Sequence, residues 1–276
     1  MFKKAAHARR EIARTFESLS IVPGPETKRA IRLSVKRDLQ AQKLRPNVPV
    51  PPRRKLFAYL RTMHLETGSW YRALTSLLHS GSWTSSGGSF RLADLLGVSM
   101  IELTEEVLRQ QGHLVFLEIG AGWAGFGNDT AAAKPQGLAA LANHYSEHLA
   151  KSVTLHFTNV TRWHDPHCLP EGVREHPYIT AATLVALEPR ELSARSVDVI
   201  YSQAAAYFEP DQKRFLEGAA QLLKSEGILI YNYDEALNEA VAQAARTLNM
   251  AIEKRRHLGG MNGTIVAFRK MDVAGG

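Results

Sequence analysis

The chain has 276 residues, enough for one large domain or for one domain of ordinary size with an extension. Its apolar content of 45% is typical of a protein with a buried core, and no apolar run approaches the roughly 18 to 20 residues of a membrane span. The N-terminus lacks the apolar core of a signal peptide. A single cysteine, Cys168, excludes an internal disulfide and a cysteine-built zinc site, and fits a reducing compartment. These features predict a cytoplasmic protein.

The net charge of +7 comes from the N-terminus of the chain. Residues 1–55 hold 15 Lys and Arg against 4 Asp and Glu, whereas residues 56–276 hold 19 against 23. Such a segment could contact nucleic acid, an anionic surface or an acidic partner, or it could be a solvated arm. The prolines clustered between positions 46 and 52 disfavour both helix and sheet. We therefore expect residues 1–55 to be a basic, proline-containing extension or linker.

Helical patterns precede the first expected strand. Residues 2–19 can form a basic helix, and residues 27–44 can form another. The apolar spacing from Leu56 to about His79, and again from Phe90 onward, predicts further helices, the last ending at Gly112. Residues 56–111 are therefore expected to form a helical N-terminal cap.

A strand that runs into a glycine-rich turn occupies residues 114–127, LVFLEIGAGWAGFG. The apolar run predicts the strand, and glycines at 120, 122, 125 and 127 predict a tight turn that opens a helix, which would continue to Pro135. Glycine tolerates positive φ and lets a ligand approach the backbone closely. The stretch is thus typical of a pocket for a nucleoside-bearing cofactor.

Strands and helices alternate in the rest of the chain. Residues 137–143 fit a strand, although their alanines make a helix equally acceptable, and residues 144–152 fit a helix. Further strands are predicted at 153–160, 196–203 and 228–234, helices at 211–227 and 235–249, a polar connection at 161–178, and a terminal antiparallel hairpin at 250–258 and 264–270. Alternation of this kind predicts a parallel sheet with helices on both faces, which binds ligands at the carboxyl ends of its strands.

Several of these pieces resemble class I S-adenosylmethionine-dependent methyltransferases. The resemblance is carried by LEIGAG at 117–122, ANHYSEHLAK at 142–151, VTLHFTNV at 153–160, SVDVIYSQAAAYF at 196–208 and QLLKSEGILIY at 221–231, together with the closing hairpin. It implies that residues 112–271 form a methyltransferase-like domain with S-adenosylmethionine as its cofactor. The implied fold is α/β, with a Rossmann-like, seven-stranded, mostly parallel sheet, a C-terminal antiparallel hairpin and a helical N-terminal extension.

The resemblance also implies roles for single residues at the cofactor. Glu118 would orient its amino-acid end, and the turn would offer backbone N–H groups and close approach at Gly120, Ala121 and Gly122. The acid that the family commonly has at the end of the second strand is replaced by Asn143 or His144, and the acid after the third strand by Asn159. Ser202 and Gln203 would line the pocket near the methyl group.

An oxygen acceptor would need a general base, for which His164, Asp165 and Tyr207 are candidates. The HDPH sequence at 164–167 could be a metal pair, but it has no third and fourth ligand at a recognisable spacing, so no metal is expected. The absence of an NPPY-type tetrapeptide at 202–205 favours a small-molecule or sugar hydroxyl as the methyl acceptor. Two alternatives stay open. One is a non-catalytic methyltransferase-like binding or assembly protein with a basic N-terminal arm, and the other is an RNA-modifying methyltransferase.

Overall fold

The computed structural model describes residues 2–44, 56–57, 60–61, 64, 70–71, 73–74, 89–126, 135–187, 192–203, 205–259 and 263–271. Its strands are β1 (Leu114–Ile119), β2 (Val153–Asn159), β3 (Val173–Pro177), β4 (Val197–Ser202), β5 (Leu223–Tyr233), β6 (Met250–Gly259) and β7 (Gly263–Lys270). Its helices are α1 (Phe2–Ser18), α2 (Pro25–Leu44), α5 (Arg91–Leu95), α6 (Met100–Gln111), α7 (Gly137–His144), α8 (Gln212–Leu222) and α9 (Asn238–Thr247), with 3-10 turns η2 (Pro166–Cys168), η3 (Ala181–Ala186), η4 (Ala206–Phe208) and η5 (Glu235–Leu237).

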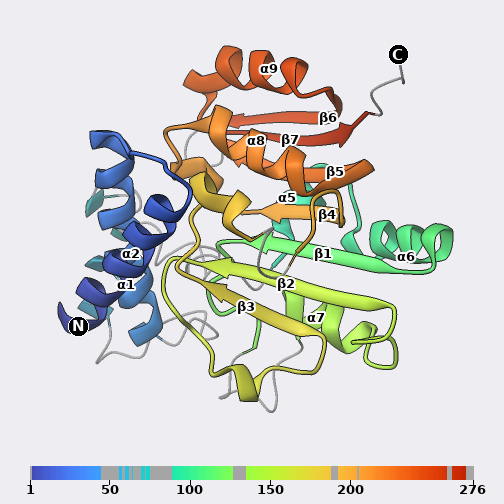
Figure 1. The fold of residues 1–276 in the computed structure, drawn as a ribbon, viewed down its shortest axis with the longest axis horizontal. Coiled ribbons are helices and arrows are strands. Elements are labelled where there is room, and N and C mark those ends of the chain that lie inside the picture. The colour runs from blue at the N-terminus through green and yellow to red at the C-terminus, as the bar shows by residue number, and fades with distance from the viewer. Residues whose placement is uncertain are drawn as a thin grey trace.

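The strands form one sheet in the order β3-β2-β1-β4-β5-β7-β6 (Figure 1). The first five strands of this order pair in parallel, and β7 pairs antiparallel with both β5 and β6. This arrangement confirms the predicted Rossmann-like α/β fold with its C-terminal antiparallel hairpin. The order of parallel strands reverses between β1 and β4, and ligands of such sheets bind beside the carboxyl ends of strands at this reversal.

Helices cover both faces of the sheet. One face packs against η3, α8 and α9 through a cluster that includes Leu117, Phe215 and Val266. The other face packs against α5, α6 and α7 through a cluster that includes Phe116 and Leu141. Because odd and even positions of a strand point to opposite faces, the two clusters interleave along β1, β4, β5 and β7. The sheet is thus the middle layer of three.

The structure corrects four sequence-based expectations about the elements. Residues 137–143, expected first as a strand, form helix α7, which agrees with the high helix propensity of their alanines, and the helix expected at 144–152 is a series of turns. The connection expected at 161–178 contains β3, an edge strand with the sequence VREHP. Residues 223–227, expected at the end of a helix, belong to β5, where 224–227 bulge out of the pairing with β4.

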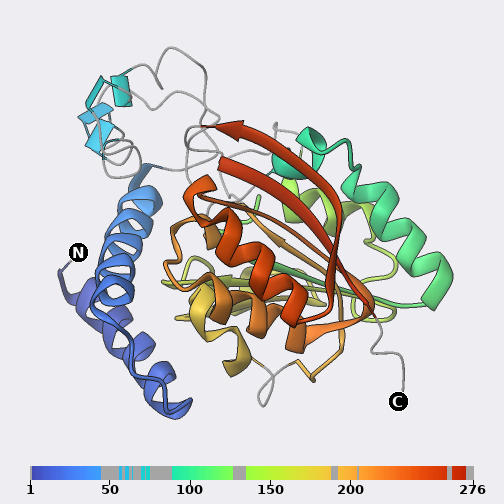
Figure 2. The same cartoon turned by 90° about the horizontal axis from the view of Figure 1, so that it is seen from above.

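The basic segment is helical and packs on the domain over residues 2–44. The inner faces of α1 and α2 form a cluster with Ala182 of η3, contributing among others Ile12, Phe16 and Leu39. The two helices lie beside each other across one end of the sheet (Figure 2), at the side toward which β1 and β2 point in Figure 1. A solvated arm is therefore wrong for these residues, which form a helical hairpin.

Other expectations fall on residues that are not described. The proline cluster, part of the expected cap over 56–111 (chiefly 75–88) and the short helix expected at 127–134 lie outside the described residues. The three proposed chain divisions at 1–55, 56–111 and 112–271 stay predictions. The helical pattern from 90 to 112 is resolved into α5 and α6, the latter capped by Ser99 and ended by Gly112 at φ 73°.

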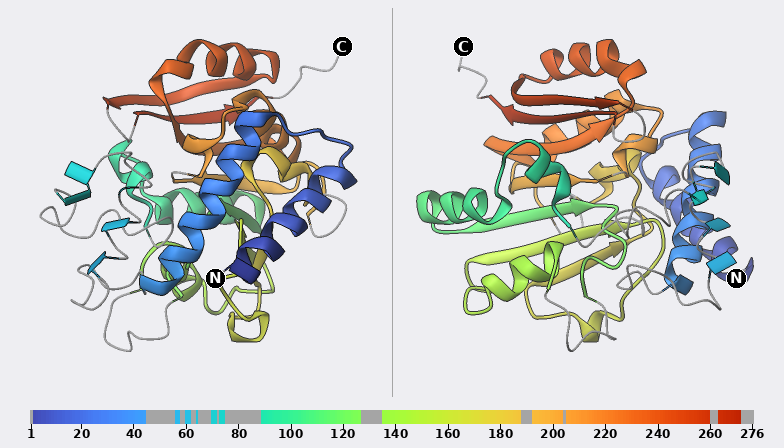
Figure 3. Two further views of the ribbon diagram at one scale, coloured as in Figure 1. Left: turned by 90° about the vertical axis from the view of Figure 1, so that its left-hand side faces the viewer. Right: turned by 180° about the vertical axis from the view of Figure 1, so that it is seen from behind.

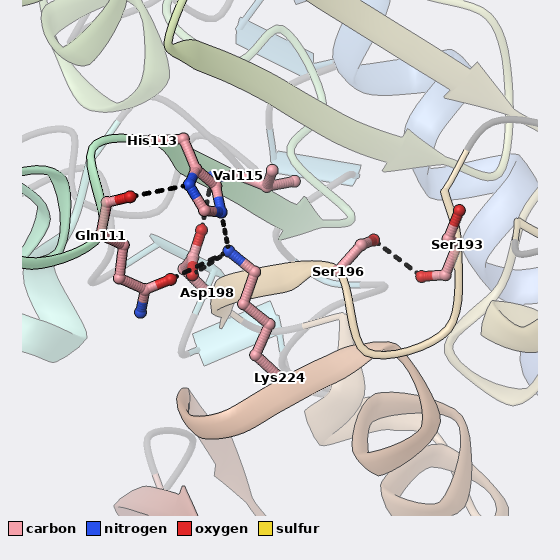
Figure 4. Close-up of polar contacts among 7 residues, drawn as sticks. All are labelled: Gln111, His113, Val115, Ser193, Ser196, Asp198 and Lys224. Atoms are coloured by element: carbon pink, nitrogen blue, oxygen red, sulfur yellow. Dashed lines mark hydrogen bonds and ion pairs between the residues drawn. The ribbon is translucent and has the colours of Figure 1, made fainter.

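A buried ion pair ties three strands together near their amino ends (Figure 4). The carboxylate of Asp198 in β4 accepts hydrogen bonds from the backbone N–H of Val115 in β1 at 2.7 Å and from Nζ of Lys224 in β5 at 2.6 Å. The Asp198 side chain is 1% exposed, and Lys224 also donates to Gln111. Nearby, Ser196 closes the loop before β4 by donating to the carbonyl oxygen of Ser193. The pair thus lies at the bulge of β5, and both of its side chains have hydrogen-bond partners.

Replacing Asp198 by alanine should lower the free energy of unfolding by about 3 kcal/mol, because it leaves the ammonium of Lys224 and the Val115 N–H without their buried acceptor. Urea denaturation at pH 7 measures this loss. The control is Lys213→Ala, which breaks an exposed pair with Glu217 at 3.8 Å and should change stability by less than about 0.5 kcal/mol. Equal losses in the two variants would contradict the role assigned to Asp198.

Candidate functional site

The glycine turn leaves β1 at the reversal of strand order. Gly120, Gly122 and Gly125 have φ of 70°, 59° and 85°, and Ala124 between them has φ of 52°. A Cβ on Gly120 would lie 2.2 Å from the Cβ of Ala205, which belongs to the segment after β4. Position 120 therefore requires glycine for two reasons, its positive φ and the close approach of the neighbouring connection. The turn and the connection after β4 form one packed unit at the carboxyl edge.

The backbone N–H groups of the turn are held by β2. Gly120 and Ala121 both donate to the carbonyl oxygen of Thr158, at 3.0 and 3.2 Å, and Gly122 donates to Oδ1 of Asn159 at 2.7 Å. Asn159 returns a hydrogen bond from Nδ2 to the carbonyl oxygen of Gly122 at 2.9 Å. In this structure the N–H groups expected to face a ligand thus already have acceptors. What the turn offers a ligand is close approach to its backbone.

Glu118 ends β1 with a buried carboxyl group. The residue is 1% exposed, and its Oε2 has no hydrogen-bond partner among the described residues. Burial raises the pKa of Glu118 to about 8, because removal from water disfavours the charged form. The same carboxyl group helps to raise the pKa of Tyr201, whose main cause is burial. Glu118 is therefore mostly protonated at pH 7, and a cation bound beside it would favour its ionised form.

A second buried polar atom without a described partner belongs to the turn itself. It is Nε1 of Trp123, an N–H donor, whereas the ionised carboxylate of Glu118 is an acceptor. Buried polar atoms nearly always have a hydrogen-bond partner, so such atoms in a native fold call for a ligand or water. One acceptor before Gly120 and one donor after Gly122 in the chain match a molecule that carries both a cationic and an anionic group.

Glu175 of β3 organises the connection that follows β2. Its Oε1 accepts from Asn159 Nδ2 and from the backbone N–H of Trp163, and its Oε2 accepts from the backbone N–H of His164, each at 2.8 Å. Nε2 of His164 then lies 3.0 Å from the carbonyl oxygen of Trp123. The chain after β2 is thereby folded back onto the glycine turn.

Helix α2 closes over this connection from outside. Asp38 accepts hydrogen bonds from Nε1 of Trp163 at 2.9 Å and from the hydroxyl of Thr161, and Gln42 donates to Thr161 and to the carbonyl oxygen of Arg162. Burial raises the pKa of Asp38 to about 6 in spite of these hydrogen bonds. We call these contacts of Asp38 and Gln42 with residues 161–163 the α2 clasp. It joins the N-terminal helices to the candidate site.

The α2 helix also reaches the segment after β4. The guanidinium carbon of Arg37 lies 4.0 Å from the centre of the Phe208 ring, a cation–π contact. Phe208 packs edge-on against Tyr207, with ring centres 5.1 Å apart. The helical hairpin therefore touches the connections that leave both strands flanking β1.

Of the expected catalytic residues, His164 lies beside the glycine turn. Its ring contacts Phe126 and Phe157, and burial lowers its pKa although Glu175 and the Trp123 carbonyl oppose the shift. Asp165 is exposed and caps η2 by accepting from the backbone N–H of His167. Tyr207 lies beyond β4 in η4. A hydrogen bond thus joins His164 to the turn, whereas Asp165 lies at the surface of the following connection.

The residues expected at the end of a second strand are placed wrongly. Asn143 and His144 end helix α7, which carries the chain away from the glycine turn to the start of β2. His144 there contacts Glu105 of α6 at 2.8 Å. The residue that does end the second strand is Asn159, which the sequence pattern assigns to the third. The pattern counts α7 as a strand, which makes β2 the third strand, and it omits β3, so the count is correct again at β4.

The polar pair at the end of β4 is engaged within the fold. Ser202 is fully buried, accepts from the backbone N–H of Ala206 and donates to the carbonyl oxygen of Ile119, so it links β4 to β1. Gln203 accepts from the hydroxyl of Tyr201 at 2.8 Å. Both residues lie at the carboxyl edge of the sheet, and the Ser202 side chain is hydrogen-bonded within the fold.

Sequence reasoning missed Asp38, Gln42 and Glu175. Asp38 and Gln42 belong to a segment that stands out for its positive charge, and a lone acid at the buried side of a basic helix was the available signal. Glu175 lies in a stretch expected to be a connection. No group of three or more His, Cys, Asp or Glu that could hold a metal ion occurs in the part of the chain that the structure describes. Within the same residues, no helix is long and apolar enough to span a membrane.

No protein-family model and no curated protein matches the sequence. A SAM-dependent methyltransferase from Aquifex aeolicus is 14% identical over 66% of this chain and 97% of that chain, with a TM-score of 0.38. The N-methyltransferase NodS from Bradyrhizobium japonicum, solved with S-adenosyl-L-homocysteine, is 14% identical over 62% of this chain and 85% of that chain, with a TM-score of 0.36. The [4+2]-cyclase SpnF is 10% identical over 62% of this chain and 80% of that chain, with a TM-score of 0.39. The fold assignment rests on the strand order itself.

The raised pKa of Glu118 predicts a specific pH dependence of stability. The folded pKa of about 8 exceeds the unfolded value of 4.5, so the stability contributed by the protonated form is complete below pH 4.5 and is lost as the pH rises to 8. The side chain of the Glu118→Gln variant does not ionise. Relative to this variant, the wild type should become less stable between pH 5 and pH 9 in urea denaturation. The exposed control Glu217→Gln should run parallel to the wild type, and parallel curves for Glu118→Gln would refute a buried, neutral Glu118.

The α2 clasp predicts that Asp38 restrains the helical hairpin. Asp38→Ala leaves the Trp163 indole N–H and the Thr161 hydroxyl without their buried acceptor, at a cost of about 2 kcal/mol, so the open population of the hairpin should rise by about tenfold or more. Trypsin cleavage within residues 2–44, followed by mass spectrometry, measures this opening. Glu26→Ala, on the exposed start of the same helix, is the control and should cleave at the wild-type rate.

Proposed function

We propose that this chain, which has the class I methyltransferase fold, is an S-adenosylmethionine-dependent methyltransferase. The observation that carries the proposal is the pair of unpartnered buried atoms, Glu118 Oε2 at the end of β1 and Trp123 Nε1 in the glycine turn, at the reversal of strand order. The methionine end of the cofactor has an ammonium group, which a carboxylate binds, and a carboxylate, which an indole N–H binds. Acceptor and donor are thus both present for that end.

When bound, S-adenosylmethionine supplies an electrophilic methyl group on a sulfonium. The chain's own contribution is mainly positioning, since methyl transfer needs an in-line approach of the acceptor. Close approach at Gly120 and Gly122 and ionisation of Glu118 would hold the methionine end. Asn159 would act indirectly by keeping the turn in place through Gly122. Ser202 and Gln203 form the end of β4 beside it.

We further propose that the acceptor is a hydroxyl of a small molecule or a sugar, with His164 as the general base. The carbonyl oxygen of Trp123 can only accept, so Nε2 of His164 carries the ring hydrogen and Nδ1 is the acceptor in the neutral ring. Burial lowers the pKa of His164, which favours this neutral form near pH 7. A neutral imidazole with its Nδ1 lone pair available can take the proton of a hydroxyl acceptor. As the general base, Asp165 would have to act from the surface of the protein, where its side chain is exposed.

One observation favours a second candidate, a non-catalytic methyltransferase-like binding or assembly protein. The position where the family commonly has a carboxylate for the ribose hydroxyls is occupied by Asn159, and its amide is already bound to Gly122 and Glu175. The nucleoside end of a cofactor would therefore be held less firmly than its methionine end. A protein of this kind would bind S-adenosylmethionine weakly or not at all and would transfer no methyl group.

Calorimetric titration with S-adenosylmethionine and S-adenosylhomocysteine distinguishes the methyltransferase from the non-catalytic protein. We expect binding in the micromolar range, with release of a proton near pH 7 because the ligand's ammonium favours ionised Glu118, and no such release in Glu118→Gln. Titrations in buffers of different ionisation enthalpy count the proton. Absence of binding up to millimolar ligand would exclude the enzyme.

The same titration tests where the site is. Asn159→Ala should weaken binding by about tenfold or more, because the N–H of Gly122 loses its acceptor and the turn loses its link to Glu175. Asn143→Ala is the matched control, an asparagine on the far end of α7, and should bind as the wild type does. A loss in Asn143→Ala with none in Asn159→Ala would show that the site has been misplaced.

A further inference from the structure

The outer face of the helical hairpin carries cations that no carboxylate neutralises. Within the described part of the chain, seven of its basic side chains make neither an ion pair nor a side-chain hydrogen bond, namely Lys3, Lys4, Arg10, Lys28, Arg29, Arg32 and Lys36. By contrast, Arg14 pairs with Glu11 at 2.8 Å. We call these seven side chains the basic face. Residues 56–276, by contrast, contain more acidic than basic residues, so the net positive charge of the chain comes from its N-terminal segment.

The spacing within α2 concentrates the charge. Lys28, Arg32 and Lys36 follow one another at intervals of four residues, so they form a stripe along one side of the helix, with Arg29 next to it. Like charges at this spacing destabilise a helix. The stripe therefore costs stability in the free protein, and an anion spread along it would remove that cost.

Most of the apolar side of the hairpin is buried, and its exposed large apolar side chains, Phe2, Val22 and Leu33, stand at separate positions along the segment. The apolar sides of α1 and α2, with Ile12, Phe16 and Leu39, are already packed against η3. A helix that binds a membrane surface needs its apolar face free to enter the headgroup region. A polyanion needs only the exposed cations, so a phosphate backbone fits this surface better than a lipid bilayer does.

The location of the basic face ties it to the candidate site. The hairpin crosses the carboxyl edge of the sheet (Figure 3, left), and the α2 clasp binds it to the connection that carries His164. Arg37 on the same helix touches Phe208 after β4. A polymer lying on α2 would thus be held beside the candidate site and not on a remote surface.

We propose that the basic face is the docking surface for RNA, bound through its phosphate backbone and presented to the carboxyl edge of the sheet. The choice of RNA over DNA rests on the proposed function, because an enzyme that methylates a sugar hydroxyl finds the ribose 2′-hydroxyl in RNA and not in DNA. The attraction itself rests only on the charge of the hairpin. Neutralised phosphates release counterions, so binding weakens steeply with salt.

Fluorescence anisotropy with a 5′-fluorescein-labelled 20-nucleotide single-stranded RNA tests the proposal on the full chain. The test variant is K28A/R29A/R32A, which removes three exposed cations of the basic face. We expect it to lose about tenfold or more in affinity at 50 mM salt, and its slope of log affinity against log salt should fall by about 2, since each phosphate contact to a single strand contributes roughly 0.7.

The matched control is R109A/K213A/R214A, which also removes three surface cations, but cations paired with Glu106, Glu217 and Asp211 on α6 and α8. It should bind RNA within twofold of the wild type. Equal losses in the two triple variants would overturn the proposal, as would wild-type affinity weaker than 100 μM at 50 mM salt. A DNA strand of the same sequence, or vesicles of one third phosphatidylserine, binding as tightly as the RNA would overturn the assignment of RNA.

Calorimetry with S-adenosylmethionine on K28A/R29A/R32A keeps this proposal separate from the proposed function. The variant should bind the cofactor as the wild type does, because none of the three side chains contacts the glycine turn or the α2 clasp. Cofactor binding without RNA binding would remove the docking surface and leave the enzyme. RNA binding without cofactor binding would remove the enzyme and leave the docking surface.

Discussion

The side-chain amide of Asn159 joins the glycine turn to the sheet, and the geometry of the candidate site depends on this link. The amide oxygen accepts from the N–H of Gly122, and the amide nitrogen donates to the carbonyl oxygen of Gly122 and to Glu175. Glu175 then holds the backbone of Trp163 and His164. A carboxylate at position 159 could accept from Gly122, but it could not donate to Glu175 and would face it as a like charge. The asparagine is therefore matched to an internal network.

This network explains where the site has unsatisfied groups. The polar atoms of Asn159 are bound within the protein. Glu118 and Trp123, by contrast, each keep a buried atom without a described partner. Burying such groups costs free energy that the fold does not recover by itself, and costs of this kind are concentrated at functional sites. A ligand with an ammonium and a carboxylate group would satisfy both.

The N-terminal hairpin combines two surfaces on one pair of helices. Its inner side is apolar and also contributes Asp38, whose buried carboxyl group binds the connection after β2. Its outer side carries the unpaired cations. Amphipathic spacing makes this division possible, because positions three and four apart share one side of a helix. The same segment can thus close the carboxyl edge of the sheet and offer a charged surface beside it.

Local sequence patterns determined much of the architecture. The apolar strands β1 and β4, the glycine turn, the hairpin of β6 and β7 and the caps of α6 follow from local propensity, periodicity and turn chemistry, and the alternation of elements indicated the parallel sheet. Patterns failed where two structures fit one sequence. The alanines of 137–143 allow both helix and strand, and the short, polar edge strand β3 has little apolar signal because solvent reaches it.

The contacts that make the site were decided by the tertiary structure, because their partners are far apart in the chain. Asp38 meets Trp163 across 125 positions and Asn159 meets Gly122 across 37, and no local pattern encodes such pairs. Burial raises the pKa of Glu118, and burial is a property of the packed layers around β1 and not of the residue type. The sequence by itself thus determined a cofactor-type turn, a doubly covered sheet and a basic N-terminus. Only folding decided that the basic segment lies across the carboxyl edge and that an asparagine holds the turn.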